Sequence, residues 1–190
     1  MAITTRRAVP ADAAELHGLA ARTFGLACPP GTRQDDITAF VAEHLAEARF
    51  AEYLADPSRI VLLAEDQGTA VGYAMLVGGP IKDPDLAATV RSADDSGTAT
   101  AIELSKFYVA PESHGSGVAA TLMTATVEAA TATGAGLCWL GVNQRNERAA
   151  KFYAKNGFEI VGTKRFLVGA VWQDDHVRAR LLTAAVRPGR

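Results

Sequence analysis

The spacing of apolar residues near the start of the chain is helical. Leu16, Leu19, Ala20 and Thr23 fall three or four residues apart, and Asp12 before them is the expected N-cap. After a proline-containing loop over 26–31, a second stripe has the same spacing: Ile37, Val41, Leu45 and Ala48. We therefore expect one strand and then three helices, over 3–8, 13–24, 35–48 and 50–54.

Strand-like patterns dominate the rest of the chain. Asp66-Gln67-Gly68-Thr69 separates two apolar, β-branched runs and predicts a hairpin, and the segment over 78–99 reads as a long connection with one helical turn. Gly157 is the expected left-handed cap that ends the last helix. The predicted strands are 60–64, 70–77, 102–109, 137–142, 158–168 and 171–182, with helices over 117–132 and 146–155. This order predicts a mixed sheet with helices on its faces.

Composition narrows the class of protein. The chain has 190 residues, 48% hydrophobic and 21% charged, which is typical of one globular domain. No apolar run approaches the roughly 20 residues of a membrane-spanning helix, and the first 16 residues lack the apolar stretch of a secretory signal. Cys28 and Cys138 stand apart, without neighbouring metal ligands. We therefore expect a cytoplasmic protein with no disulfide, metal site or membrane association.

Charge is divided unevenly along the chain. Residues 35–95 carry twelve acidic against four basic side chains, whereas residues 96–190 carry eleven basic against seven acidic ones. Most of these charges are expected on ordinary solvated surface. The division also suits an anionic cofactor on the second half and a cationic acceptor near the first. No dense basic stripe occurs, so nucleic acid is not an expected partner.

A glycine-containing loop is the first candidate binding site. It runs from Pro111 to Gly117, between the strand over 102–109 and the helix over 117–132. Glycines let the backbone approach a ligand closely, and the N–H groups at a helix N-terminus attract anions such as a pyrophosphate. A plain tight turn explains such a loop equally well, and the dinucleotide-binding glycine pattern is missing from this sequence.

Two motifs together resemble the acetyl-CoA-binding core of the GCN5-related N-acetyltransferases, the GNAT superfamily. The family's phosphate loop has an arginine or glutamine, two variable residues, a glycine, one variable residue and a glycine or alanine. The corresponding positions here are His114, Gly115, Ser116, Gly117, Val118 and Ala119. His114 departs from the pattern, so one side-chain contact should be weaker. The second motif fits at Asn146, Ala149, Phe152, Tyr153, Lys155, Gly157 and Phe158.

The resemblance implies a fold and a co-substrate. The fold is the GNAT acyl-CoA N-acyltransferase fold, an α/β architecture with a central twisted mixed sheet of about six to seven strands and helices on both faces. One domain over 1–190 would comprise an acceptor-side half, about 1–99, and an acetyl-CoA-binding core, about 100–168. Acetyl-CoA is the implied co-substrate, without a metal. The residues expected to bind it are Phe107, Tyr108, Val109, His114, Gly115, Ser116, Gly117, Val118, Ala119, Asn146, Tyr153 and Lys155.

Two residues are candidates for the chemistry. Tyr153 matches the tyrosine that the family places beside the thioester sulfur, so we expect it to act as the acid. An ammonium with a pKa of about 10.4 needs help to lose its proton at neutral pH. Glu103 is the candidate base, directly or through water, although a strand glutamate is as often a surface residue. Asn146 has two compatible roles, capping a helix and contacting pantetheine. A buried Cys138 favours direct transfer in a ternary complex over a covalent acetyl-cysteine.

The acceptor is open at this stage. The strand from Glu103 to Val109 resembles the PaiA-like polyamine acetyltransferase branch, and the acidic first half suits a polyamine or another small cationic amine. The alternatives are a protein or peptide N-acetyltransferase, a non-catalytic acetyl-CoA-binding sensor or interaction module, and a nucleotide-binding domain of another class. A homodimer paired through the two C-terminal strands is also open.

Overall fold

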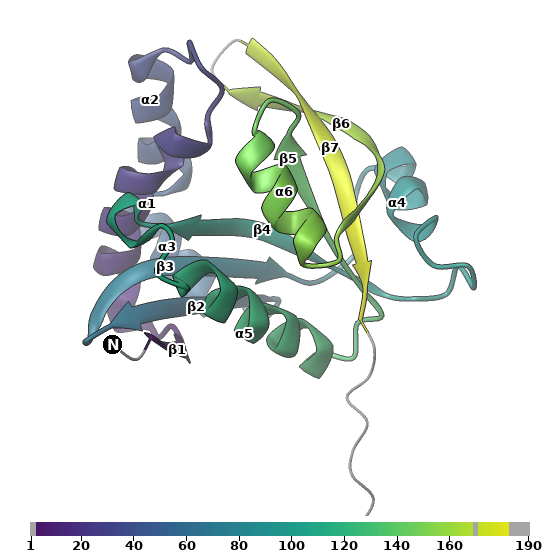
Figure 1. Ribbon diagram of the computed structural model, residues 1–190, viewed down its shortest axis with the longest axis horizontal. Helices are drawn as coiled ribbons and strands as arrows, with labels where there is room; N and C mark the ends of the chain where they lie inside the picture. Colours follow the sequence, from purple (N-terminus) through teal and green to yellow (C-terminus); the bar gives the residue numbers. More distant parts are fainter. Residues whose placement is uncertain (1–2, 169–170, 183–190) are drawn as a thin grey trace, which may run out of the picture.

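Seven strands form one mixed sheet in the order β1-β2-β3-β4-β5-β7-β6 (Figure 1). The computed structural model describes residues 3–168 and 171–182. The strands are β1 (Ile3–Arg7), β2 (Arg59–Asp66), β3 (Thr69–Val77), β4 (Ala101–Val109), β5 (Leu137–Asn143), β6 (Glu159–Val168) and β7 (Val171–Leu181). The helices are α1 (Ala13–Ala27), α2 (Gln34–His44), α3 (Glu47–Ala55), α4 (Pro84–Arg91), α5 (Val118–Ala132) and α6 (Glu147–Lys155). The predicted mixed sheet is confirmed.

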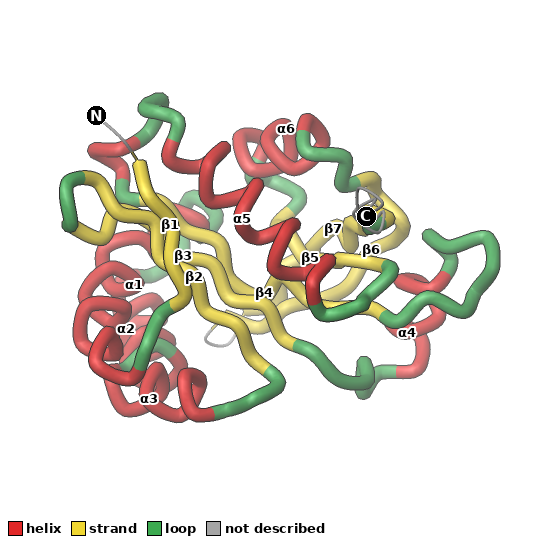
Figure 2. Tube along the Cα trace, turned by 90° about the horizontal axis from the view of Figure 1, so that it is seen from below, coloured by secondary structure: helices red, strands yellow, loops and turns green. Residues whose placement is uncertain are grey.

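Helices cover both faces of the sheet, as Figure 2 shows. On one face α5 and α6 pack around Leu122 and Phe158, and on the other α1 and α3 pack around Leu16 and Phe50. A third cluster, centred on Trp139, lies where α4 meets β5 and β7. None of the helices in the described ranges has the length and apolar character needed to cross a membrane.

The predicted hairpin between β2 and β3 is confirmed. Gln67 and Gly68 have φ angles of 51° and 80°, the two left-handed residues that a two-residue type I′ turn requires. The strands β1 to β4 follow one another as antiparallel neighbours. This meander places β4 in the middle of the sheet, beside β5.

Asp12 does not cap the first helix as predicted. Its carboxylate makes no capping hydrogen bond to α1. Instead it accepts hydrogen bonds from the Val9 backbone N–H at 2.7 Å and from the Arg6 guanidinium at 2.7 and 2.9 Å. The hydrogen bond from Arg6 is the main reason that the pKa of Asp12 lies below its usual value. Asp12 therefore ties β1 to the turn before α1, a long-range role that local spacing did not reveal.

Two other predicted helices have different limits. The helix expected over 35–48 is interrupted, because α2 ends at His44 and Ala48 lies exposed on the separate helix α3. The connection over 78–99 contains α4, which is eight residues long rather than one turn. Asp83 caps it, because its carboxylate accepts hydrogen bonds from the backbone N–H groups of Asp85 and Leu86.

The parallel strands β4 and β5 separate partway along their length. Their pairing runs from Ala101 with Leu137 to Glu103 with Trp139, after which β5 turns away from β4 (Figure 1). Ser105 is an extra residue in β4 at this point, because Leu104 pairs with Leu76 of β3 while Lys106 pairs with Met75. Such a bulge bends a strand and re-aims its side chains. The result is an opening in the middle of the sheet.

Candidate active site

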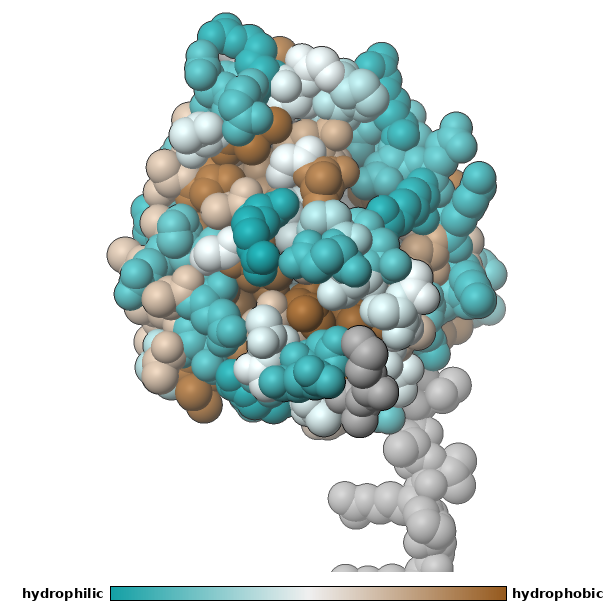
Figure 3. All heavy atoms as spheres, turned by 60° about the vertical axis from the view of Figure 1, so that its left-hand side comes forward, coloured by the Kyte–Doolittle hydropathy of each residue, from teal (hydrophilic) through white to brown (hydrophobic). Residues whose placement is uncertain are grey.

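Two hollows meet at the opening between β4 and β5. The outer pocket lies beside α6 and is lined by Val109, His114, Ala119, Arg148 and Phe152. The inner cavity, of about 260 Å³, lies beside α1 and α2 and is lined by Phe24, Phe40, Glu103, Lys106, Lys164 and Asp175. Figure 3 shows the side of the molecule that carries α1 and α2, where hydrophobic residues gather among hydrophilic ones. Both hollows share the lining residues Phe107, Tyr108, Asn146, Ala149 and Tyr153.

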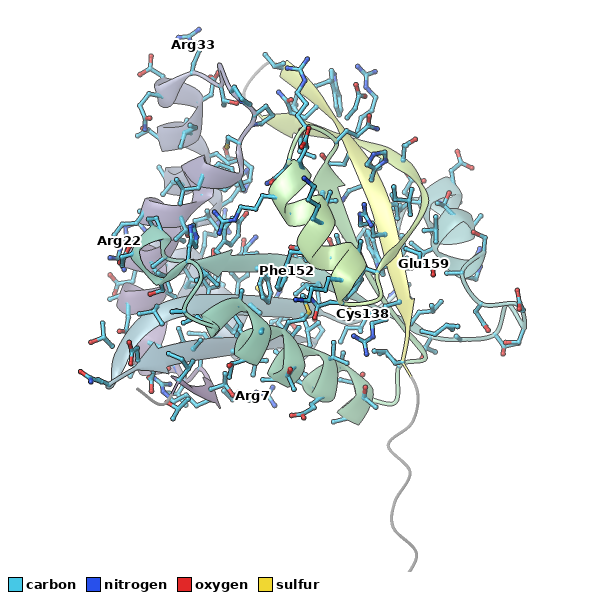
Figure 4. The ribbon with its side chains drawn as sticks, viewed as in Figure 1. Arg7, Arg22, Arg33, Cys138, Phe152 and Glu159 are labelled. Atoms are coloured by element: carbon cyan, nitrogen blue, oxygen red, sulfur yellow. The ribbon has the colours of Figure 1, made fainter. Side chains whose placement is uncertain are left out.

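Tyr153 stands where the two hollows join. It projects from α6, and its ring packs edge-on against Phe107, Phe152 and Phe158 with centroids 6.3, 5.6 and 5.9 Å away. In Figure 4 the neighbouring Phe152 likewise points from α6 toward the sheet. Burial raises the pKa of Tyr153 above its ordinary value, so its hydroxyl keeps its proton at neutral pH.

The structure places Glu103 in the inner cavity with Tyr153. Glu103 is half-buried. The preceding residue, Ile102, points into the core beneath α5, so Glu103 points to the opposite face of the sheet. Lys106 lies on the Glu103 side of β4, with its ammonium 5.6 Å from the Tyr53 ring centroid. Burial lowers the pKa of Lys106 to about 8 against the opposing attraction of Glu103. The cavity therefore contains a carboxylate beside an easily neutralised lysine.

The glycine loop adjoins the outer pocket, which is lined by His114 and Ala119 at the two ends of the loop motif. Gly115 and Gly117 have φ angles of 85° and 91°, a left-handed backbone that other residues adopt only with strain. A Cβ added to either glycine would meet no atom within 4 Å, so the loop borders open space. Gly117 directly precedes α5, whose first N–H groups have no acceptor within the helix. This arrangement fits an anionic group such as a phosphate.

His114 holds the loop rather than facing an anion. Its Nε2 lies 3.0 Å from the carbonyl oxygen of Val109, and its Nδ1 lies 2.9 Å from Nη1 of Arg148. An arginine only donates hydrogen bonds, so Nδ1 accepts and Nε2–H donates, which makes the imidazole neutral. Both ring nitrogens of His114 are therefore occupied by protein groups in this arrangement. Arg148, which the sequence analysis missed, brings a positive charge to the loop instead.

Of the remaining residues expected to bind the cofactor, some lie at or beside the outer pocket and one, Lys155, lies away from it. Asn146 caps α6, because its Oδ1 accepts from the Ala149 N–H at 3.0 Å, and it also lines both hollows. Val118 is buried, so only its backbone is available, and the Ser116 hydroxyl donates to the Ser113 carbonyl at 2.7 Å. Lys155 is the residue that the structure does not bring to the site. It is at the opposite end of α6 from Asn146 and lines a separate hollow with Asn156 and Arg180.

Several cavity residues were not found by sequence reasoning. Gln173 and Asp175 come from β7 and Lys164 from β6, and the two strands meet at the pair Lys164 and Asp175. Asp175 lies on the same face of β7 as the buried residues Val177 and Ala179. That alternation was the available signal, since a carboxylate in register with buried residues points inward.

Comparisons with known proteins identify the family of the chain. The sequence model of the Acetyltransferase (GNAT) family matches residues 30–158. An uncharacterized N-acetyltransferase of Mycobacterium tuberculosis is 47% identical over 171 residues, which cover 90% of this chain and 98% of that protein. The chain therefore belongs to the GNAT family of acetyltransferases. As a member it is an acetyl-CoA-dependent N-acetyltransferase.

Solved structures support the fold. The PaiA N-acetyltransferase of Thermoplasma acidophilum, in complex with coenzyme A, superposes with a TM-score of 0.75 at 18% identity, covering 95% of this chain and 99% of that one. The structure of yncA from Salmonella typhimurium, with its cofactor acetyl-CoA, has a TM-score of 0.62 at 21% identity and covers 100% of this chain and 99% of that one. The predicted GNAT fold is confirmed.

Proposed function

We propose that this enzyme transfers the acetyl group directly from acetyl-CoA to the primary amine of a small molecule within a ternary complex. The observation that carries the proposal is the meeting of the outer pocket and the inner cavity at Tyr153. A donor bound from the α6 side and an acceptor bound from the α1–α2 side would have their reacting atoms at the same point. Holding two reactants in this way is a large part of catalysis in transfer reactions.

The donor would occupy the outer pocket. The loop from His114 to Ala119 would bind its pyrophosphate through backbone N–H groups, with Arg148 adding a positive charge. The backbone of Phe107, Tyr108 and Val109 lies beyond the point where β4 leaves β5, so its polar groups can pair with the pantetheine amides as a neighbouring strand would. Asn146 would contact the same arm. Acetyl-CoA supplies the activated acetyl group in this arrangement.

Tyr153 would act on the leaving sulfur. Burial raises its pKa, so the hydroxyl holds a proton at Oη and can donate a hydrogen bond as charge develops on the thiolate. Glu103 is the base predicted from the sequence, and it lies in the same cavity. The polyamine acceptor also stays a prediction. The cavity holds two lysines beside its two carboxylates, so its charge alone does not select a polycation.

The test compares Tyr153→Phe with Tyr73→Phe. Tyr73 is a matched control, because its hydroxyl is fully buried and has no hydrogen-bond partner among the described residues. Turnover is read as release of free CoA thiol with a panel of amines, and acetyl-CoA affinity is read by calorimetry. We expect Tyr153→Phe to lower turnover about 10²-fold or more with nearly unchanged affinity, and Tyr73→Phe to retain both.

Unchanged turnover in Tyr153→Phe at several pH values would show that the Tyr153 hydroxyl does not take part in catalysis. Acetyl-CoA binding without thiol release for any amine would favour the non-catalytic sensor instead.

Two further expectations belong to this proposal. We infer a cytoplasmic location, which fractionation of cells that make the protein would test. A homodimer formed along β6 is also proposed, because β6 is an edge strand of the sheet and Ile160 and Leu167 on it are exposed. Sedimentation of the purified chain would distinguish this dimer from a monomer.

A further inference from the structure

Asp175 is an acidic residue whose burial has no evident structural purpose. Its side chain faces the inner cavity, and the residue is 7% exposed. Within the described residues, no hydrogen bond or ion pair reaches its carboxylate. The neighbouring Asp174 is exposed on the other side of β7 and lies 4.0 Å from Arg165. A buried carboxylate without a close partner is destabilising, so such a group in a cavity points to a charged ligand.

The surroundings of Asp175 leave room for that ligand. A Cβ at Gly141 would collide with Lys164 and lie 3.2 Å from Oδ2 of Asp175, so the glycine allows both side chains to reach into the cavity. Burial raises the pKa of Asp175 to about 6, while Lys164 opposes the rise and Asp174 adds to it. The titratable groups that face it across the cavity are Lys164 on β6, Glu103, Lys106 and Tyr108 on β4, Cys28 at the end of α1 and Tyr153 on α6.

Glu103 and Asp175 are not equivalent. Glu103 lies beside Lys106 on the same strand, and its attraction keeps the pKa of Lys106 from falling further. Its charge is thus partly balanced within β4. Asp175 is the more deeply buried of the two, and it lines the cavity with Tyr108 and Tyr153. Each carboxylate therefore has one lysine nearby, Lys106 for Glu103 and Lys164 for Asp175, and the carboxylate on β7 is distinguished by its deeper burial.

We propose that Asp175 binds the ammonium group of the acceptor in the inner cavity and accepts the proton that frees its nitrogen for reaction. This role rests on the proposed function. The nitrogen then uses its lone pair to form the N–C bond, while the C–S bond breaks with its electron pair on sulfur. The second proton of the nitrogen passes to the sulfur, which leaves as a thiol beside Tyr153. Asp175 returns its proton to solvent, so one proton is released in each turnover.

The cavity also selects the kind of amine. Phe24 and Phe40 line one wall with their rings stacked, the centroids 4.3 Å apart and the planes 1° from parallel. Lys106 and Lys164 line the same cavity, and their charged forms would repel a second ammonium group. The acceptor class is therefore a monoamine with an apolar or aromatic body rather than a polyamine.

The experiment compares four variants with the wild-type chain: Asp175→Asn, Asp175→Glu, Glu103→Gln and Asp174→Asn. Asp174→Asn is the matched control, because it removes the same charge one residue away on the exposed side of β7. The measurements are kcat/KM for the amine from pH 5 to 9, the Kd for acetyl-CoA, and Tm. The amines are 2-phenylethylamine and spermidine.

Each result has a definite expectation. Wild-type kcat/KM should be level between about pH 6 and 7.5, below the pKa of about 8 of Lys106, and should fall below pH 6, where Asp175 gains a proton. Asp175→Asn should lower kcat/KM about 10²- to 10⁴-fold at pH 7. Its residual activity should rise about tenfold per pH unit, because it depends on free amine. The Kd of Asp175→Asn for acetyl-CoA should be unchanged. Its Tm should rise, because the amide replaces a buried charge. Asp175→Glu and Asp174→Asn should keep the level region. Glu103→Gln tests the competing carboxylate, and the shape of its pH profile should stay level whatever the height of its kcat/KM.

Other results would overturn the inference. A level region that persists in Asp175→Asn, or that disappears in Glu103→Gln, would place the base elsewhere. Equal or better kcat/KM with spermidine would refute the acceptor class. A wild-type chain that releases no thiol with any amine would overturn the proposed function together with this role. Normal wild-type turnover with an undiminished Asp175→Asn variant would overturn this role alone.

Discussion

The proposed phosphate-binding role of the glycine loop can be separated from its structural role by one substitution. Gly117→Ala places a methyl group on a residue with a φ of 91°, next to the first turn of α5. The same helix provides a matched control at its other end. Gly134 has a φ of 82°, and a Cβ at either glycine meets no atom within 4 Å. The two substitutions therefore impose similar strain just beyond the opposite ends of a helix of 15 residues, which is about 22 Å long.

The expected loss of stability arises from the backbone, and the expected loss of acetyl-CoA affinity arises from the contact with the ligand. A left-handed alanine costs about 1–2 kcal/mol, which for a chain of this size lowers Tm by about 2–8 °C. Both variants should show this loss. In Gly117→Ala the methyl group also projects into the space proposed for the pyrophosphate. Loss of one charge-assisted hydrogen bond costs about 1.5–3 kcal/mol, so Kd for acetyl-CoA should rise about ten- to a hundredfold.

The assay is a thermal melt with acetyl-CoA at 100 times its wild-type Kd. The ligand should stabilise the wild-type chain and Gly134→Ala by about 2.7 kcal/mol, a rise of about 5–10 °C. The weaker binding of Gly117→Ala should limit the rise to about 1–5 °C. NAD and ATP serve as ligand controls. Equal rises in the two variants would refute a phosphate site at this loop, and equal rises with NAD would refute its selectivity for acetyl-CoA.

Two other predictions concern groups outside the loop. Burial raises the pKa of Cys138 to about 12, so its thiolate is scarce at neutral pH. Cys138→Ala should therefore retain release of free CoA thiol. A folded Cys138→Ala variant without activity would instead support a covalent acetyl-cysteine route. Asp12→Asn should lower the free energy of unfolding by about 1–3 kcal/mol at pH 7. Because Arg6 lowers the pKa of Asp12, this difference is full above about pH 5 and shrinks as acid protonates the carboxylate. A difference in urea melts that stays constant down to pH 2 would contradict the pairing.

The region of α5 and α6 was the part of the fold that local sequence signals predicted best. The helix expected over 117–132 is α5 over Val118–Ala132, and the one expected over 146–155 is α6 over Glu147–Lys155. Their ends carry local signals that the structure bears out: Asn146 caps α6 through its side chain, and Gly157 has a φ of 78° after the same helix. Such signals act within four residues, so they can be recognised without the tertiary structure.

The inner cavity could not be predicted in the same way. Its charged residues lie in β4, β6 and β7, and its apolar wall lies in α1 and α2. Asp175 is inward-facing only because β7 pairs with β5 at Asn143 and with β6 at Lys164. A one-residue change of register would turn the same carboxylate outward. Alternation along β7 marks Asp175 as inward-facing, but the cavity that it shares with residues of β4, β6, α1 and α2 becomes recognisable only after the strands are placed.

The departure at His114 shows how a family pattern can be met by different residues. The family places an arginine or glutamine at this loop position, whereas here a neutral imidazole bridges the Val109 carbonyl and the Arg148 guanidinium. The charge that the loop position lacks is therefore supplied from α6, 34 residues later in the sequence. Because the imidazole fixes both the end of β4 and this arginine, a loss of either His114 or Arg148 should disturb the same site. The loop pattern alone predicts a weakened anion site. The hydrogen bonds of His114 with Val109 and Arg148 instead favour an anion site assembled from two segments of the chain.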